Sequence, residues 1–291
     1  MGKSFAGIQY KWLVAIAFVA GLFMDIMDST IVNVALPQLG IHFHANNTTL
    51  EWIVTGYLLS LAVWIPASAW FGDRFGTKKV FLFALAMFTL GSALCGMADS
   101  IGMLIFFRIV QGIGGGMMTP VGTSMLYRAF PPEERAAATA VLIIPAAVAP
   151  ALGPVLGGWL VDNASWRWIF YVNLPIGVLG FIWTFFLLHE EKQHEPGKFD
   201  VPGFILSGAG LPLVLFALSQ APHAGWTSPK VLATGLIGVV LFIALIVYEL
   251  RVEEPLLHLR IFGDRMYRNG MMAVFAVFAG LIGIIFLLPL F

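Results

Sequence analysis

The chain has 291 residues, of which 59% are hydrophobic and only 11% are charged, and its mean hydropathy is +0.88. Soluble domains are about 25% charged, so a soluble fold of this length could not bury so much apolar surface, and we expect lipid around the protein. The 16 basic and 16 acidic side chains balance, which argues against a nucleic-acid partner. The single Cys95 excludes a disulfide framework and a cysteine metal site.

Nine apolar runs are long enough to cross a bilayer, which takes about 20 residues. They lie at residues 12–36, 52–71, 80–98, 102–127, 137–160, 167–188, 202–219, 231–249 and 269–291. The first run is too long for the apolar part of a signal peptide, so we expect it to remain as a membrane span. The predicted fold class is therefore an all-α integral membrane protein with about nine transmembrane helices.

The basic residues gather on one side if the spans alternate across the membrane. Thirteen share the side of the N-terminus, namely Lys3, Lys11, Arg74, Lys78, Lys79, Arg128, Arg135, Lys192, Lys198, Arg251, Arg260, Arg265 and Arg268. Only Arg167 and Lys230 fall on the other side, and Arg108 lies inside a span. Because cytoplasmic loops carry the excess of Lys and Arg, we expect a multi-pass protein of the cytoplasmic membrane with a cytoplasmic N-terminus.

The longest charged linker divides the predicted helices into groups. The linker HEEKQHEPGKFD, at 189–200, separates an N-terminal six-helix bundle over 1–188 from two additional helices over 201–250. A cytoplasmic loop over 251–268 then leads to one further helix over 269–291. The chain stops at Phe291 within an apolar run, so we expect it to be the front part of a longer protein.

Two acidic residues lie inside the first span, in the stretch MDIMDSTIVNVALP. Asp25 and Asp28 are three residues apart, so they share one face of a helix. A charge at the bilayer centre costs about 2.5–3.5 kcal/mol, so such residues face a bundle interior or a watery cavity. A desolvated carboxyl group is suited to taking up a proton on one side of the membrane and releasing it to the other. The alternative is an acid that only bonds a neighbouring helix.

One basic residue, Arg108, lies inside the fourth span, in LIFFRIVQGIGGGMMTPVG. Its guanidinium does not lose its proton, so it needs carbonyl groups, water or an acid from another helix. Gln111 and Gly112 follow on nearly the same helix face, and Gly112 and Gly116 have the spacing that permits close helix approach. Arg108 therefore either controls the proton affinity of an acid or only holds two helices together.

Two further stretches break the apolar pattern. In PAAVAPALGPVLGG, within the fifth span, small residues recur every four positions at Pro145, Ala149, Gly153 and Gly157. Pro150 and Pro154 are expected to kink this helix, which would let it rock against a neighbour, although static packing fits the spacing as well. In AWFGDRFGTKK, at 69–79, Asp73 and Arg74 are expected to latch helix ends together, and an ordinary basic loop is the alternative.

Together these stretches resemble the motifs of the major facilitator superfamily, in particular its fourteen-span drug:proton antiporter branch. MDSTIVNVALP resembles the first-span motif with Asp28 at its acidic position, and LIFFRIVQGIGGG resembles the fourth-span motif with Arg108 at its arginine. EWIVTGYLLS and WRWIFYVNLPIG also resemble this branch. In the fifth span the residues that match the family motif are Gly153, Pro154, Gly157 and Gly158. In the loop between spans two and three they are Asp73, Arg74, Gly76 and Lys78. The departures from these two motifs are Ala69, Thr77 and Ala149.

The resemblance implies two six-span bundles around a central cavity, with two extra spans between them. It also implies export of hydrophobic, often cationic drugs or dyes in exchange for protons, with the proton gradient as energy source and no cofactor or metal. Asp28 and Asp25 would carry protons, and Arg108 would tune them. The expected partners are the lipid bilayer, protons and these substrates, with self-association if 291 residues is the working length.

Several polar and aromatic residues are expected to line the substrate cavity. They are Asn33, Trp52, Thr55, Tyr57, Trp64 and Gln111. Cation–π contacts with such aromatic rings contribute about 0.5–2 kcal/mol each, which suits a flat cation, although Trp and Tyr also populate membrane interfaces.

Two other functions stay open. One is a uniporter or symporter of the same fold that moves a sugar, peptide or lipid. The other is a membrane scaffold or subunit that transports nothing. An enzyme is not expected, because the sequence has no HExxH or GxSxG motif and its GIGGG stretch lacks the Lys and Ser/Thr of a phosphate-binding loop.

Overall fold

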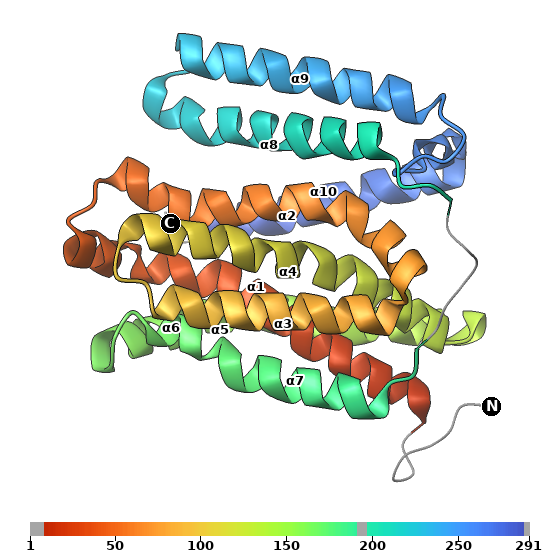
Figure 1. The fold of residues 1–291 in the computed structure, drawn as a ribbon, viewed down its shortest axis with the longest axis horizontal. Coiled ribbons are helices and arrows are strands. Elements are labelled where there is room, and N and C mark those ends of the chain that lie inside the picture. The colour runs from red at the N-terminus through yellow and green to blue at the C-terminus, as the bar shows by residue number, and fades with distance from the viewer. Residues whose placement is uncertain (1–8, 191–196, 288–291) are drawn as a thin grey trace.

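The computed structural model describes residues 9–190 and 197–287, and this part of the chain is almost entirely helical (Figure 1). Its elements are α1 (Tyr10–Phe43), α2 (Asn47–Phe75), α3 (Thr77–Gly96), α4 (Ile101–Ala129), η1 (Pro132–Glu134), α5 (Arg135–Asn163), α6 (Trp168–Tyr171), α7 (Asn173–Leu187), α8 (Val201–Ala224), α9 (Pro229–Glu249), η2 (Leu259–Gly263) and α10 (Arg265–Leu287). Eight stretches of the described residues are long and apolar enough to cross a membrane. The predicted all-α membrane fold is confirmed.

The ninth predicted span, 269–291, is only partly covered. Helix α10 contains its first part, and residues 288–291 lie outside the described ranges. Lys3 and Lys192, two of the basic residues assigned to the side of the N-terminus, also lie outside the described ranges, as do positions 191–196 of the predicted linker.

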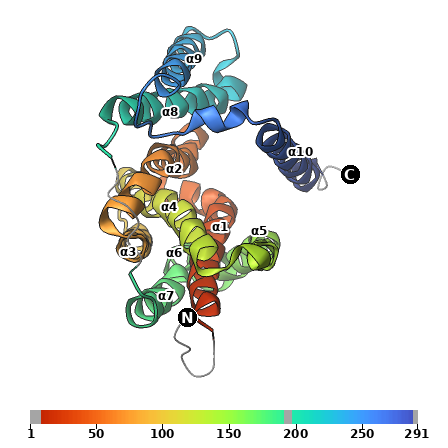
Figure 2. The same cartoon turned by 90° about the vertical axis from the view of Figure 1, so that its right-hand side faces the viewer.

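Helices α1 to α7 form one bundle in which α1 is central. Helix α1 contacts α2, α4, α5, α6 and α7, and α4 packs against both α2 and α3. Helices α8 and α9 form an antiparallel hairpin that lies on α2 through α8 (Figure 2). Helix α10 contacts η2 and stands apart from the bundle in this view.

The sixth predicted span is interrupted. It consists of the short helix α6 and the longer α7, with Val172 between them. Pro175 accounts for the break, because a proline has no amide hydrogen and its ring clashes with the carbonyl group four residues earlier, here that of Tyr171. Helix α5, in contrast, is one helix through Pro145, Pro150 and Pro154.

The bundle has two apolar cores with a polar layer between them. One core, near the α2–α3 connection, contains Phe18 and Phe81, and the other, near the α1–α2 connection, contains Ile31 and Phe170. Along α1, Asp28 lies between the residues of the first core and those of the second. The polar layer is therefore fixed in position by packed apolar side chains on both sides.

Candidate functional site

The polar layer is built around the buried carboxylate of Asp28. Arg108 donates from Nη1 to its Oδ2 at 2.5 Å, while Gln111 and Asn173 donate to its Oδ1 at 3.0 and 2.9 Å. All four side chains are at most 1% exposed. Arg108 also donates from Nε to the carbonyl oxygen of Ile53 at 3.2 Å and from Nη1 to Gln111 at 2.8 Å. The site thus joins α1, α2, α4 and α7 through charge-assisted hydrogen bonds.

Asn173 was missed at the sequence level. It is the first residue of α7, and its amide also donates to Ser92 of α3 at 3.0 Å, while Ser92 donates to the carbonyl of Phe170 at 2.9 Å. A buried amide just before the Leu-Pro pair of WRWIFYVNLPIG is a visible sequence signal. The rotation of the helix that directs this amide toward Asp28 cannot be deduced from the sequence.

Asp25 has a different environment from Asp28. It is half-buried, and its two oxygens accept hydrogen bonds from the hydroxyl groups of Tyr57 and Thr119, the latter at 3.4 Å. A Cβ atom added to Gly115 would lie 3.2 Å from Asp25 Oδ1 and 2.7 Å from the Tyr57 hydroxyl, so the missing side chain leaves space at this carboxyl group.

Tyr57 connects the two acids. Its hydroxyl contacts Asp25, while its ring lies below the guanidinium of Arg108, with 4.1 Å from Cζ to the ring centroid. Tyr57 is fully buried, so its ring faces other side chains from α1, α3 and α4 and cannot present its face to a substrate in this conformation. Tyr57 therefore lies in contact with both the Asp25 carboxyl group and the Arg108 guanidinium.

Glycines set the distances between the helices of the site. A Cβ at Gly112 would lie 2.6 Å from Cβ of Ser60, and one at Gly116 would lie 3.0 Å from the Leu61 carbonyl oxygen, so both let α4 approach α2. The close approach that their spacing predicted is present. It places the Arg108 side chain within reach of the α2 backbone.

The small-residue stripe of α5 packs on α1 beside the acids. A Cβ at Gly153 would overlap Thr30, and one at Gly157 would lie 2.8 Å from Ile31. Ala149 and Pro145 are buried on the same side. Pro154 is exposed and Gly158 has no neighbouring atom within 4 Å of an added Cβ, so these two motif residues lie off the α1 contact.

The loop motif between α2 and α3 is joined to distant helices. Asp73 accepts from Arg128 of α4 at 2.7 Å and so joins the ends of α2 and α4, whereas Arg74 is exposed. Lys78 donates from Nζ to the carbonyl groups of Phe185 and Leu188 at the end of α7, at 2.7 and 2.6 Å. Side chains of adjacent residues on a helix point apart, which explains why Asp73 reaches α4 and Arg74 does not.

Gly76 and Glu190 complete this corner. Gly76 has a φ of 99°, which favours glycine, and an added Cβ would overlap the Glu190 carboxylate. Glu190 accepts from the backbone amides of Lys78 and Lys79, both at 3.2 Å, and so caps the start of α3.

The other residues predicted to line the substrate cavity do not lie together in one place. Asn33 is exposed and donates to the carbonyl of Ser29 in its own helix at 3.1 Å, and Thr55 is half-buried. Trp52 packs against Phe216 and Trp64 against Phe204, with ring centroids 5.4 and 5.9 Å apart, so both face α8. Contact with substrate stays a prediction for these residues. Among the described residues, no group of three or more His, Cys, Asp or Glu side chains could hold a metal ion.

Comparisons with known proteins agree with this architecture. The sequence model of the Major Facilitator Superfamily matches residues 18–291. The chain is 36% identical over 276 residues to the uncharacterized MFS-type transporter YhcA of Bacillus subtilis, covering 95% of this chain and 52% of that protein. It is 38% identical over 265 residues to a multidrug resistance protein B homolog of Mycobacterium tuberculosis, covering 90% of this chain and 49% of the relative.

A solved structure shares the fold. The crystal structure of the peptide transporter POT in complex with sulfate covers 86% of this chain and 54% of that transporter, with a TM-score of 0.62 and 14% identity. The chain spans about half the length of the curated relatives it matches. With its eight described membrane helices and its family match over residues 18–291, the chain belongs to the major facilitator superfamily of membrane transporters.

Proposed function

We propose that the chain contributes to proton-coupled export of hydrophobic, often cationic drugs or dyes across the cytoplasmic membrane, driven by the proton gradient without a cofactor. The relatives named multidrug resistance proteins support the substrate class. The excess of basic residues at the end of the bundle that carries the α2–α3 connection supports a cytoplasmic location for that end and for the N-terminus.

The unequal pairing of Asp25 and Asp28 carries the proposal. Among the described residues, every hydrogen-bond partner of Asp28 is an N–H group, which only donates, so a proton on Asp28 would displace at least one of them. The partners of Asp25 are hydroxyl groups, which can either donate to a carboxylate or accept from a carboxylic acid. Asp25 therefore gains and loses a proton without losing its partners.

Of the two acids expected to carry protons, this arrangement favours Asp25 over Asp28. We propose that the proton binds Asp25 and that Tyr57, which contacts Asp25 and Arg108, passes the change to the Asp28–Arg108 pair. With Asp25 ionised, one excess negative charge remains beside Arg108 and Asp28. That charge favours either a proton or a cationic substrate, which is the competition that antiport requires.

Ethidium uptake into energised everted vesicles tests the proposal. In the wild-type chain we expect uptake that a protonophore abolishes. Asp25→Asn is expected to insert normally and to lose this coupled uptake, while Asp28→Asn is expected to lose uptake and thermal stability together, because it weakens the pairing of a buried arginine. Asp99→Asn, at an acid 88% exposed, is the matched control.

Two results would contradict the proposal. Coupled uptake that survives in Asp25→Asn would exclude Asp25 as the carrier. A wild-type chain that inserts fully and takes up no ethidium, with or without a gradient, would count against export of this cargo by this chain.

A further inference from the structure

The two ends of the α8–α9 hairpin meet at a pair of buried carboxyl groups. Asp200 directly precedes α8 and is 7% exposed, and Glu249 is the last residue of α9 and is 0% exposed. Both lie against Gly203, where an added Cβ would overlap Asp200 Oδ2 and lie 2.6 Å from Glu249 Oε1. These two oxygens therefore face the same small space.

The hydrogen bonds of the two acids are unequal. Asp200 accepts from the amide of Gly203 at 2.9 Å, the hydroxyl of Tyr248 at 3.0 Å and the amide of Leu256 at 3.3 Å. Glu249 accepts on Oε2 from the amide of Leu257 at 3.2 Å. Its Oε1 is buried and has no partner among the described residues.

A buried charged oxygen without a donor is costly, and a carboxyl group in this position takes up a proton instead. Asp200 has three donors to its two oxygens, whereas Glu249 Oε1 has none among the described residues, so this geometry places a shared proton on Glu249. We propose that Asp200 and Glu249 form a proton-binding site in which Glu249 holds the proton on Oε1 and donates it to Oδ2 of Asp200.

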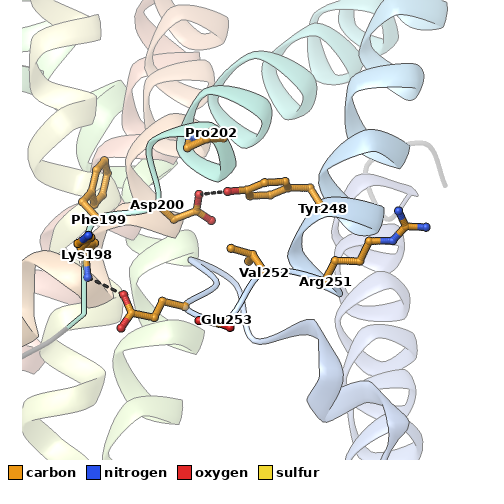
Figure 3. A pocket seen from close by; sticks show the side chains of 9 residues that line it. Lys198, Phe199, Asp200, Pro202, Tyr248, Arg251, Val252 and Glu253 are labelled. Atoms are coloured by element: carbon orange, nitrogen blue, oxygen red, sulfur yellow. Dashed lines mark hydrogen bonds between the residues drawn. The ribbon is translucent and has the colours of Figure 1, made fainter.

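This site lies at the end of the bundle proposed to be cytoplasmic and apart from the proton site in α1. Figure 3 shows Asp200 and Tyr248 pointing toward each other at a cavity of about 640 Å³, which Asp200 lines and Glu249 does not. The charged groups that line this cavity or the adjoining one of about 290 Å³ are Lys198, Arg251, Glu253, Glu254, Asp73 and His258. The backbone amide of Lys198 donates to Glu254 at 2.7 Å, so the neighbouring acid has a donor of its own.

The bound proton holds three segments together. Asp200 belongs to the start of α8, Glu249 to the end of α9, and the amides of Leu256 and Leu257 to the segment that leads to η2 and α10. Loss of the proton would leave two adjacent carboxylates that repel each other. A glutamate of the unfolded chain loses its proton at about pH 4.3, whereas Glu249 of the folded chain keeps it, so stability must fall as the pH rises above that value.

Thermal unfolding of the full chain in detergent tests this. Above about pH 5, where a glutamate of the unfolded chain is ionised, we expect the wild-type Tm to fall by about 3–5 °C per pH unit until Glu249 of the folded chain also loses its proton. The variant Glu249→Gln replaces the neutral acid by an amide that donates to Asp200, so its Tm should match the wild type at low pH and stay flat. Glu253→Gln, at an exposed neighbour, should keep the wild-type slope.

An infrared spectrum provides a measurement that does not depend on unfolding. We expect a carbonyl band from a protonated carboxyl group that survives in Asp25→Asn and Asp28→Asn and disappears in Glu249→Gln and Glu249→Ala. A pH slope equal in the wild type and Glu249→Gln, or a band unchanged by both Glu249 variants, would overturn the proposal. Stabilisation of the wild type by Na⁺ or K⁺ at high pH, absent in Glu249→Gln, would show that a metal cation occupies the site instead, and would overturn it too.

Discussion

Arg108 of α4 and Asp28 of α1 form an ion pair with 2.5 Å between Nη1 and Oδ2, and their side chains are 1% and 0% exposed. Removing both charges from such a buried pair is often nearly neutral, whereas removing one leaves the other without compensation. The bundle is therefore expected to tolerate the loss of both charges better than the loss of one.

Arg108→Ala is predicted to lower the free energy of unfolding by about 3–5 kcal/mol, because the Asp28 carboxylate stays buried and loses its counterion. Thermal unfolding in detergent and the yield of inserted protein would measure the loss. The control is Arg74→Ala, at an exposed arginine of the α2–α3 loop.

The double variant Arg108→Gln with Asp28→Asn separates stability from coupling. It removes both charges, so we expect most of the stability to return while coupled uptake stays absent. A double variant as unstable as Arg108→Ala would show that the hydrogen-bond geometry, rather than the charge balance, holds the helices.

Asn173→Ala is predicted to reduce stability by about 1–3 kcal/mol, because Asp28 Oδ1 would keep Gln111 as its remaining donor and Ser92 would lose its amide partner. Asn33→Ala is the matched control, since that amide is exposed and bonds only its own helix among the described residues. Equal effects of the two variants on the Tm would show that the Asn173 amide does not support Asp28.

Part of this site is predictable from the sequence. The other part is not, and the reason is physical. A charge in an apolar run must face a protein interior, so the burial of Asp28 and Arg108 and the need of Arg108 for a partner on another helix follow from the sequence alone. The choice of Asp28 over Asp25 does not, because both lie on one face of α1 and three residues of helix rotation and rise decide which of them Arg108 reaches.

The hydrogen-bond partners that the sequence did not predict were missed for the same reason. Asn173 and Asp28 are 145 residues apart in sequence, and Arg128 and Asp73 are 55 apart. Periodicity within one helix defines its apolar face, but it contains no information on the rotation and register of a second helix that packs against it. The spans were therefore located well, while the bonds between them required the structure.

Tyr57→Phe tests the connection between the acids. The ring would remain under Arg108, but the hydroxyl that donates to Asp25 would be lost. A lost hydrogen bond of about 0.5–1.5 kcal/mol predicts that coupled uptake slows by about 2- to 10-fold with little change in insertion. Tyr127→Phe is the control, since its hydroxyl bonds Thr139 away from the site. Unchanged coupling in Tyr57→Phe would exclude the hydroxyl from proton transfer.

Gly76→Ala is predicted to destabilise the α2–α3 corner by more than backbone strain alone. A non-glycine residue at positive φ costs about 1–2 kcal/mol, and here the new methyl group would also displace Glu190 from the amides at the start of α3. Gly225→Ala is the matched control, because Gly225 has a φ of 84° and no atom within 4 Å of an added Cβ. The difference in Tm between the two variants measures the Glu190 contact, and equal losses would mean that Glu190 does not stabilise this corner.

The contact between α5 and α1 is tested by two glycines of one motif. Gly153→Ala places a methyl group on Thr30, which follows Asp28 by two residues in α1, and such overpacking predicts a loss of about 1–3 kcal/mol. Gly158→Ala meets no atom within 4 Å and replaces a helical glycine, so it should stabilise the chain by about 0.5–1 kcal/mol. Because the two substitutions add the same methyl group to the same helix, opposite shifts in Tm can only come from the α1 contact. Shifts of the same sign would mean that α5 does not pack on α1 through Gly153, and the idea that this stripe guides the movement of α5 along α1 would lose its basis.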